Sequence, residues 1–130
     1  MRLLAFILLL VGAEVFAGDF RVHGSIAGRV ENDGTVRVGG SIAGKFENGG
    51  DIRVRGSLTG RIESDGSIRK NGSLIGKVEN NGDVRKSGSI VGRIESNGDV
   101  RDHGSIVGRV EGMTKEQAAA LFFFDFFDIR

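Results

Sequence analysis

The sequence predicts an all-β protein: a ring of about six antiparallel β-hairpins, closed by the N- and C-terminal strands, with a short C-terminal helix. Three observations predict this fold. A unit of 16 residues repeats between residues 18 and 112, apolar and polar residues alternate within it, and glycine-containing turns interrupt the alternation. The unit reads G-S-(I/L)-x-G-(R/K)-(V/I/F)-E-(N/S)-x-G-(D/T/S)-(V/I)-R-x-x.

The first 17 residues, MRLLAFILLLVGAEVFA, have the layout of a secretory signal peptide. Arg2 lies near the start, an apolar stretch follows from Leu3 to Val11, and Val15 and Ala17 occupy the −3 and −1 positions of a cleavage site. The stretch is too short to span a bilayer comfortably, so we expect no transmembrane span in the mature chain. We expect an exported protein that is periplasmic, outer-membrane-associated or extracellular.

The composition excludes several kinds of site. The chain has no cysteine, so it can form neither a disulfide framework nor a thiolate metal site. Its formal net charge is +1, which gives no electrostatic reason to expect nucleic acid or an anionic membrane as a partner. We expect no cofactor.

Each repeat has two halves, and each half is predicted to form a short strand that is buried on one face. The first halves begin at Gly24, Gly40, Gly56, Gly72, Gly88 and Gly104. The alternation predicts three rows of core residues. These rows are Ile26, Ile42, Leu58, Leu74, Ile90 and Ile106; Val30, Phe46, Ile62, Val78, Ile94 and Val110; and Phe20, Val36, Ile52, Ile68, Val84 and Val100.

The turns and the phase of the repeat predict how the strands connect. ENDG and its variants suit a type I turn followed by a left-handed glycine, and the second connection, VGGS and its variants, is nearly as short. The mature chain would begin with a second half at Gly18 and end its repeats after a first half at Gly112. Pairing the two ends would complete a sixth hairpin and remove exposed strand edges. A two-sheet β-solenoid is the alternative architecture.

A glycine recurs in the middle of each first half, on the apolar side of the alternation. Glycine weakens a strand, by about 0.5–1 kcal/mol at each position. We therefore expect that backbones approach closely there, near a crowded axis. These inner glycines are Gly28, Gly44, Gly60, Gly76, Gly92 and Gly108.

The repeat ends before residues 113–130, which read MTKEQAAALFFFDFFDIR. Thr114 and Gln117 have capping-box spacing, and KEQAAAL is strong helix-forming sequence. The following residues are apolar on nearly every side, so the helix must be buried or shared with a partner. We expect it to pack across the end of the ring, with oligomerisation or membrane association as the alternatives. The candidate interaction residues are Phe122, Phe123, Phe126 and Phe127.

These motifs resemble those of the bacterial beta-flower proteins, described as four-fold or five-fold. The resemblance lies in LTGRIESDGSI at residues 58–68 and in KEQAAALFFFDFF after the last strand, and it covers essentially the whole mature chain. It implies hairpin petals around a central axis, export, and no established activity. The present chain departs from that pattern in having six hairpins.

An arginine recurs in every second half and is never replaced by lysine, so the planar guanidinium fork is expected to matter there. One interpretation is a structural network with the glutamates between neighbouring hairpins. The alternative is a ring that binds an anionic ligand. This arginine row is Arg21, Arg37, Arg53, Arg69, Arg85 and Arg101.

His23 and His103 both precede GSI and are five repeats apart, so a closed ring of six hairpins makes them neighbours. Two imidazoles could share a metal ion, although the position also suits any tolerated polar turn residue.

No catalytic motif is present, and acid and base residues occur in six near-equivalent copies rather than in one differentiated site. We therefore expect a non-enzymatic structural or interaction module that associates with itself or with an envelope protein. A small-ligand or anion-binding protein is the alternative.

Overall fold

The computed structural model describes residues 18–129, and the expected signal peptide lies outside the described residues. Twelve strands are followed by helix α2 (Lys115–Phe122). The strands are β1 (Gly18–Val22), β2 (Ser25–Val30), β3 (Thr35–Val38), β4 (Ser41–Phe46), β5 (Asp51–Val54), β6 (Ser57–Ile62), β7 (Ser67–Lys70), β8 (Ser73–Val78), β9 (Asp83–Lys86), β10 (Ser89–Ile94), β11 (Asp99–Asp102) and β12 (Ser105–Val110).

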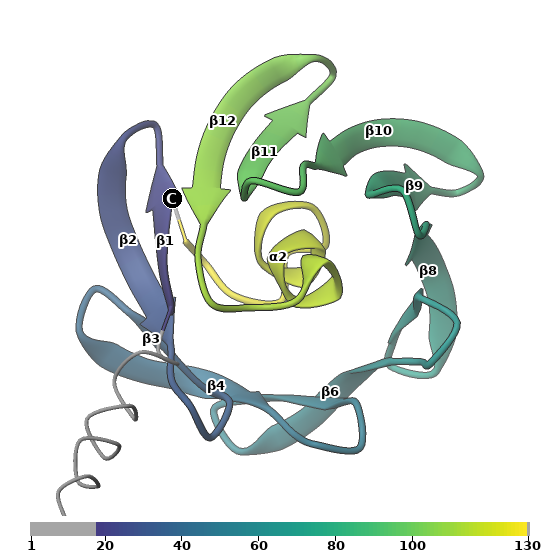
Figure 1. Ribbon diagram of the computed structural model, residues 1–130. Coiled ribbons are helices and arrows are strands. Elements are labelled where there is room, and N and C mark those ends of the chain that lie inside the picture. The colour runs from purple at the N-terminus through teal and green to yellow at the C-terminus, as the bar shows by residue number, and fades with distance from the viewer. Residues whose placement is uncertain (1–17, 130) are drawn as a thin grey trace, which may run out of the picture.

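All twelve strands belong to one closed antiparallel barrel, in which each strand pairs with its neighbours in the chain. The barrel closes where β1 pairs with β12, with Phe20 opposite Val110 and Arg21 opposite Arg109. Figure 1 shows this ring, with the first and last strands side by side. The predicted closure is confirmed, and the alternative of an open solenoid is wrong.

Two kinds of turn alternate around the ring. In the shorter turn both central residues have positive φ, for example Asn71 at 51° and Gly72 at 86°, which is the type I′ geometry of a two-residue hairpin. The longer turn ends in a left-handed glycine, as predicted, and the N–H of Gly34 donates to the carbonyl of Glu31 at 2.8 Å. We call each hairpin with the shorter turn a petal. The petals are β1–β2, β3–β4, β5–β6, β7–β8, β9–β10 and β11–β12.

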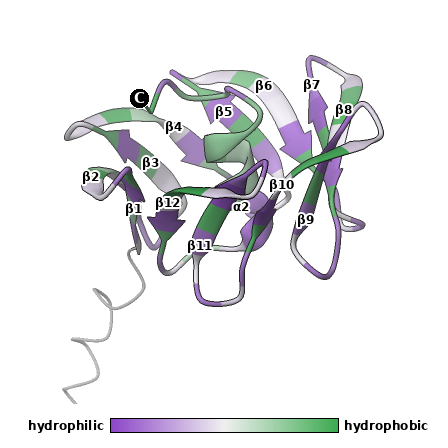
Figure 2. Ribbon diagram, turned by 90° about the horizontal axis from the view of Figure 1, so that it is seen from above, coloured by the Kyte–Doolittle hydropathy of each residue, from purple (hydrophilic) through white to green (hydrophobic). Residues whose placement is uncertain are grey.

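Two of the three predicted core rows are confirmed. The row that includes Phe20 is fully buried in all six petals, and the row that includes Val30 is buried except at Ile62, which is partly exposed. Figure 2 shows hydrophobic and hydrophilic residues alternating along the strands, which is the pattern that the repeat predicts.

The third predicted row is on the outside, so its assignment to the core is wrong. Ile26 and its five counterparts are 50–61% exposed. The cause is a bulge in each petal: Phe20 lies opposite Gly28, but the next residue, Arg21, lies opposite Ile26, so Ala27 is the extra residue. The extra residue reverses the alternation, so that Ile26 shares the outer face with Arg21 and Ala27 packs against the core.

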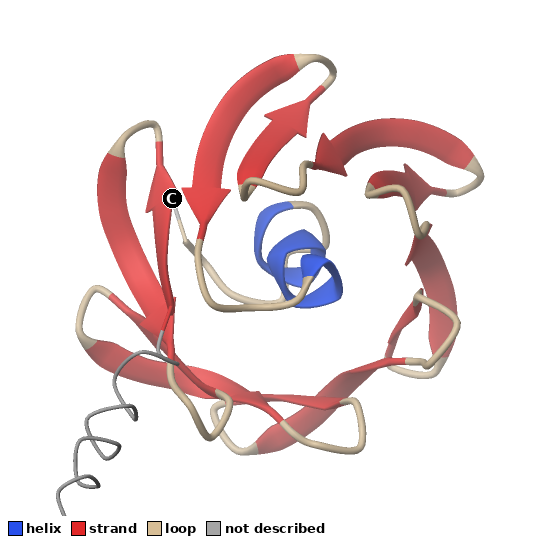
Figure 3. Ribbon diagram, in the orientation of Figure 1, coloured by secondary structure: helices blue, strands red, loops and turns tan. Residues whose placement is uncertain are grey.

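Helix α2 begins with the predicted capping box. The hydroxyl of Thr114 accepts from the Gln117 N–H at 3.0 Å, and the Gln117 side chain accepts from the Thr114 N–H at 3.2 Å. The helix ends at Phe122, so most of the aromatic run beyond it is not helical. Figures 1 and 3 show α2 inside the ring, whereas we expected from the sequence that it would pack across the end of the ring.

The inner glycines provide the space for phenylalanine rings. A Cβ built on any of them would lie within 3.0 Å both of a carbonyl oxygen of the neighbouring petal and of a phenylalanine ring. The close approach inferred from the sequence is therefore present, and it involves aromatic rings as well as backbone. The pairs are Gly28 with Phe20, Gly44 with Phe127, Gly60 with Phe126, Gly76 with Phe124, Gly92 with Phe123 and Gly108 with Phe122.

The tail thus supplies one ring to each of five successive petals, and β1 supplies the sixth from its own strand. Lys70 binds the tail at residues 124–126. Its Nζ donates to the carbonyl oxygens of Phe124 and Asp125, each at 3.1 Å, and lies 4.9 Å from the centroid of the Phe126 ring. The tail therefore fills the axis of the barrel and forms the core together with the two inward rows of strand residues.

Candidate functional site

The outer face of the barrel carries the arginine row, and its geometry explains why lysine does not replace arginine there. The Nε of Arg37 donates to the Glu31 carboxylate at 2.7 Å, while its Nη1 donates to the carbonyl of Gly40 at 3.2 Å. The glutamate precedes the turn that enters the strand, and the glycine lies in the turn that leaves it. The fork therefore braces two successive turns, which a single ammonium group could not do in the same way.

The same ion pair recurs in five of the six repeats, with N–O distances of 2.7 to 3.0 Å. Arg21 is the exception: among residues 18–129 it has no ion pair, and its Nη1 donates only to the Gly24 carbonyl, at 3.4 Å. The structure thus joins five of the six predicted arginines to glutamates, as in the network interpretation. The five pairs are Arg37–Glu31, Arg53–Glu47, Arg69–Glu63, Arg85–Glu79 and Arg101–Glu95.

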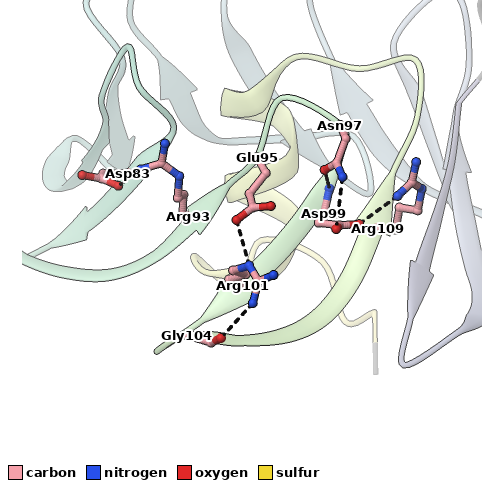
Figure 4. A network of polar contacts seen from close by, with 8 residues as sticks. All are labelled: Asp83, Arg93, Glu95, Asn97, Asp99, Arg101, Gly104 and Arg109. Atoms are coloured by element: carbon pink, nitrogen blue, oxygen red, sulfur yellow. Dashed lines mark hydrogen bonds and ion pairs between the residues drawn. The ribbon is translucent and has the colours of Figure 1, made fainter.

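A second set of ion pairs lies across each of three petals. Arg109 donates to Asp99 at 2.8 Å, and the N–H of Asp99 in turn donates to the Asn97 side chain at 3.0 Å. Figure 4 shows this chain of contacts beside the Glu95–Arg101–Gly104 brace. Equivalent pairs join Arg61 to Asp51 and Arg93 to Asp83.

Where the strand residue is Thr35 or Ser67 instead of aspartate, the turn carries the carboxylate. The N–H of Thr35 donates to Asp33 at 2.9 Å, and this hydrogen bond is the main cause that lowers the pKa of Asp33 below its ordinary value of 3.8. The N–H of Ser67 lowers the pKa of Asp65 in the same way. In these two repeats the carboxylate therefore lies in the longer turn instead of on the strand, and each repeat keeps one carboxylate in this region.

The two histidines occupy turns of neighbouring petals. His23 and His103 each take the first position of a type I′ turn, with φ of 49° and 50°. The Nδ1 of His103 lies 2.5 Å from the Asp102 carboxylate. In the part of the chain that the structure describes, no three His, Asp or Glu side chains are grouped so as to hold a metal ion. The metal site remains a sequence-based hypothesis with two candidate ligands.

The four phenylalanines predicted as interaction residues are buried inside the barrel. Phe122, Phe123, Phe126 and Phe127 are 4–6% exposed. Phe127 also packs edge-to-face on Phe46, with ring centroids 5.7 Å apart. These side chains are therefore core residues of the folded chain.

The large apolar residues that do reach the surface form a band that sequence reasoning assigned to the core. We call it the aliphatic belt. Next to one of its members, Leu58, a groove of about 370 Å³ lies between two petals, with walls that include Gly60 of β6, Arg69 of β7 and Gly72 of the turn that follows β7. The belt consists of Ile26, Ile42, Leu58, Leu74, Ile90 and Ile106, each of them at least half exposed.

A signal for this belt exists in the sequence. The residue that follows each belt position is Ala, Thr, Ile or Val, so that two residues without charge stand side by side before each inner glycine. Strict alternation does not produce such pairs, and a bulge beside a glycine does.

Recesses also occur where the tail enters the ring, between the longer turns and residues 112–117. The largest measures about 640 Å³ and is lined by Glu31, Asp33, Met113 and Gln117, among others. A neighbouring recess of about 540 Å³ is lined by Glu95, Asn97 and Lys115. Their linings are turn residues with mixed polarity and no concentrated set of catalytic groups.

In residues 18–129, no helix has the length and apolar character needed to cross a bilayer. The chain matches no protein-family model, no curated protein sequence and no solved structure.

Proposed function

We propose that this protein is an exported, non-enzymatic structural or interaction module of the cell envelope or the extracellular space, and that it binds its partner through the aliphatic belt. The observation that carries this proposal is the exposure of the belt, which is 50–61% at every one of its six positions. A single exposed aliphatic residue is ordinary, but here one recurs at the same outward position in all six petals, which gives the surface six repeated apolar contact points.

The interior favours the outer surface as the place of function. The tail fills the axis with aromatic rings, and the recesses beside residues 112–117 are lined by turn residues of mixed polarity. The anion-binding alternative has weaker support, because five of the six arginines of the arginine row already hold a carboxylate. Polar groups in near-equivalent copies also favour a repeated contact over one catalytic centre.

The family and the compartment are part of the same proposal. The petals around an axial tail support the view that the chain is a six-petalled relative of the beta-flower proteins. The N-terminal 17 residues support export with cleavage before Gly18.

The test compares the natural protein with a belt variant in which all six belt residues are changed to serine. Both would be produced with the N-terminal leader, and extracts of the exported fraction would be separated by size. We expect a mature N-terminus at Gly18, association of the natural protein with larger material, and release of the belt variant as a free monomer with an unchanged melting temperature. The matched control changes the exposed neighbours Ser25, Ser41, Ser57, Ser73, Ser89 and Ser105 to alanine.

The control should associate as the natural protein does. Association of the belt variant to the same extent would contradict the belt as the contact surface. Retention of the leader on a cytoplasmic protein would contradict export.

A further inference from the structure

We infer that the partner of the aliphatic belt is a second copy of this chain, and that copies assemble laterally, petal against petal. The inference rests on the proposed function and specifies its partner. Three features of the outer face support this inference. They are the balance of its charges, the groove beside the exposed Leu58, and the number of petals that carry a belt residue.

The charges around the belt suit a copy of the same surface. Arg53 lies directly opposite Leu58 in the petal β5–β6, and it holds Glu47 at 3.0 Å with both side chains more than one third exposed. Arginine and glutamate thus accompany the belt in equal measure. An anionic surface would attract the arginines but repel the glutamates, whereas a copy turned by a two-fold rotation can set each arginine against a glutamate. The formal net charge of +1 leaves little repulsion between copies.

An exposed side chain and a groove lie next to each other at Leu58. Leu58 is 57% exposed and borders the groove of about 370 Å³ between strands β6 and β7. In a two-fold contact, Leu58 of each copy would enter the groove beside Leu58 of the other. On one side of the groove a Cβ on Gly72 would meet nothing within 4 Å, so that side is open to a side chain of this size.

The number of contacts decides the form of the assembly. One petal presents a single half-exposed aliphatic side chain. A contact through this side chain buries far less surface than the ~1,000 Å² that a stable interface buries. A dimer through one petal would therefore be weak. A ring in which each of six petals carries a belt residue can make two-fold contacts in several directions, and molecules joined through two or more such contacts form an open array. Because each molecule in such an array makes several contacts at once, the array is stable at concentrations at which a dimer is not.

Sedimentation velocity and electron microscopy of the purified protein, without any other component, test this inference over a range of concentrations. We expect monomers at low concentration, and sheets or larger clusters with few dimers at high concentration. Changing one belt residue to serine should have little effect. Changing three alternate ones should raise the concentration needed for assembly about ten-fold or more, and changing all six should abolish it. Thermal unfolding checks that each variant remains folded.

A purified protein that stays monomeric at all concentrations would overturn the inference. If that protein nevertheless joins larger material in extracts through its belt, the proposed function stands with a different partner. Flotation with vesicles of phosphatidylglycerol and phosphatidylcholine tests whether the partner of the belt is a lipid surface. Belt-dependent binding of the monomer to these vesicles would identify a lipid surface as the partner and would overturn assembly between copies. If the variant with six serines joined larger material in extracts and also assembled in pure form as readily as the natural protein, the proposed function would be overturned as well.

Discussion

The ring of Phe126 lies against the α-carbon of Gly60, in a place that a larger residue would need for its own side chain. A Cβ on Gly60 would approach both this ring and the carbonyl of Arg69 to less than 3.0 Å. We therefore predict that Gly60→Ala lowers the free energy of unfolding by about 1–3 kcal/mol, as overpacking of a tight core does. Urea unfolding measures the change.

Gly49→Ala is the matched control, since a Cβ there would meet nothing within 4 Å. It should change stability by less than about 0.5 kcal/mol. The contact itself is tested by combining Gly60→Ala with Phe126→Leu, which removes the ring. The cost of the alanine should fall in that background, although the Arg69 carbonyl keeps part of it. Equal costs in both backgrounds would show that the tail does not occupy this place.

The arginine fork is tested by lysine at three positions together, Arg37, Arg53 and Arg69. Each guanidinium holds a glutamate and a turn carbonyl at once, and lysine would keep only one of these contacts. We predict a loss of about 0.6–3 kcal/mol for the triple variant, because exposed pairs contribute about 0.2–1 kcal/mol each. Arg29→Lys serves as the control. An equally stable triple variant would mean that the fork geometry contributes nothing.

Arg55 stands in a left-handed conformation, with φ of 51°, at a position where the next petal has Asn71 at the same angle. Asparagine tolerates this conformation better than arginine. We predict that Arg55→Asn raises stability by about 0.5–1 kcal/mol, seen as a higher melting temperature. The reverse exchange, Asn71→Arg, should lower it by a similar amount. If both exchanges are neutral, the type I′ geometry of these turns is wrong.

The turn carboxylates predict a dependence on pH. The Thr35 N–H holds the pKa of Asp33 below 3.8, so the ionised carboxylate stabilises the fold above that pH, and this contribution is lost as the pH falls through the lowered pKa. In Asp33→Asn the amide can still accept the bond, as Asn81 does from Asp83. The natural protein should therefore exceed the variant in stability at pH 6, and the difference should shrink in acid.

Asn97→Asp provides the opposite case, because it places a second carboxylate beside Asp99. It should destabilise the protein at pH 6 and do so less in acid. Parallel stability curves for the natural protein and both variants between pH 6 and pH 2 would contradict the account.

Much of the architecture could be predicted from the repeat, because turns and strands depend on the conformational preferences and polarity of neighbouring residues. Glycines such as Gly34 mark turns, alternation marks strands, and the phase at Gly18 and Gly112 favours pairing of the two ends. The position of Ile26 could not be predicted from alternation alone. A bulge is a change of one residue in register, and it moves every later side chain to the other face.

The roles of the glycines and of the tail could be predicted only in part, because they depend on each other. The sequence shows six inner glycines and five clustered phenylalanines in the tail. Their pairing depends on where the tail runs, which no local pattern specifies. Phe20 is the clue within the repeat: it alone places phenylalanine in a row of valine and isoleucine, and it fills the petal that the tail does not reach.

The closure of the ring is tested most directly by a disulfide between its first and last strands. Arg21 and Arg109 lie opposite each other on β1 and β12, and the chain has no other cysteine to compete. Paired antiparallel residues have Cα atoms about 5.5 Å apart, which suits a disulfide. We predict that Arg21→Cys with Arg109→Cys forms an intramolecular bond under mild oxidation, found by mass spectrometry of a non-reduced digest, whereas Arg21→Cys with Arg61→Cys does not. A protein whose first pair remains reduced, or bonds only between molecules, would contradict the closed ring.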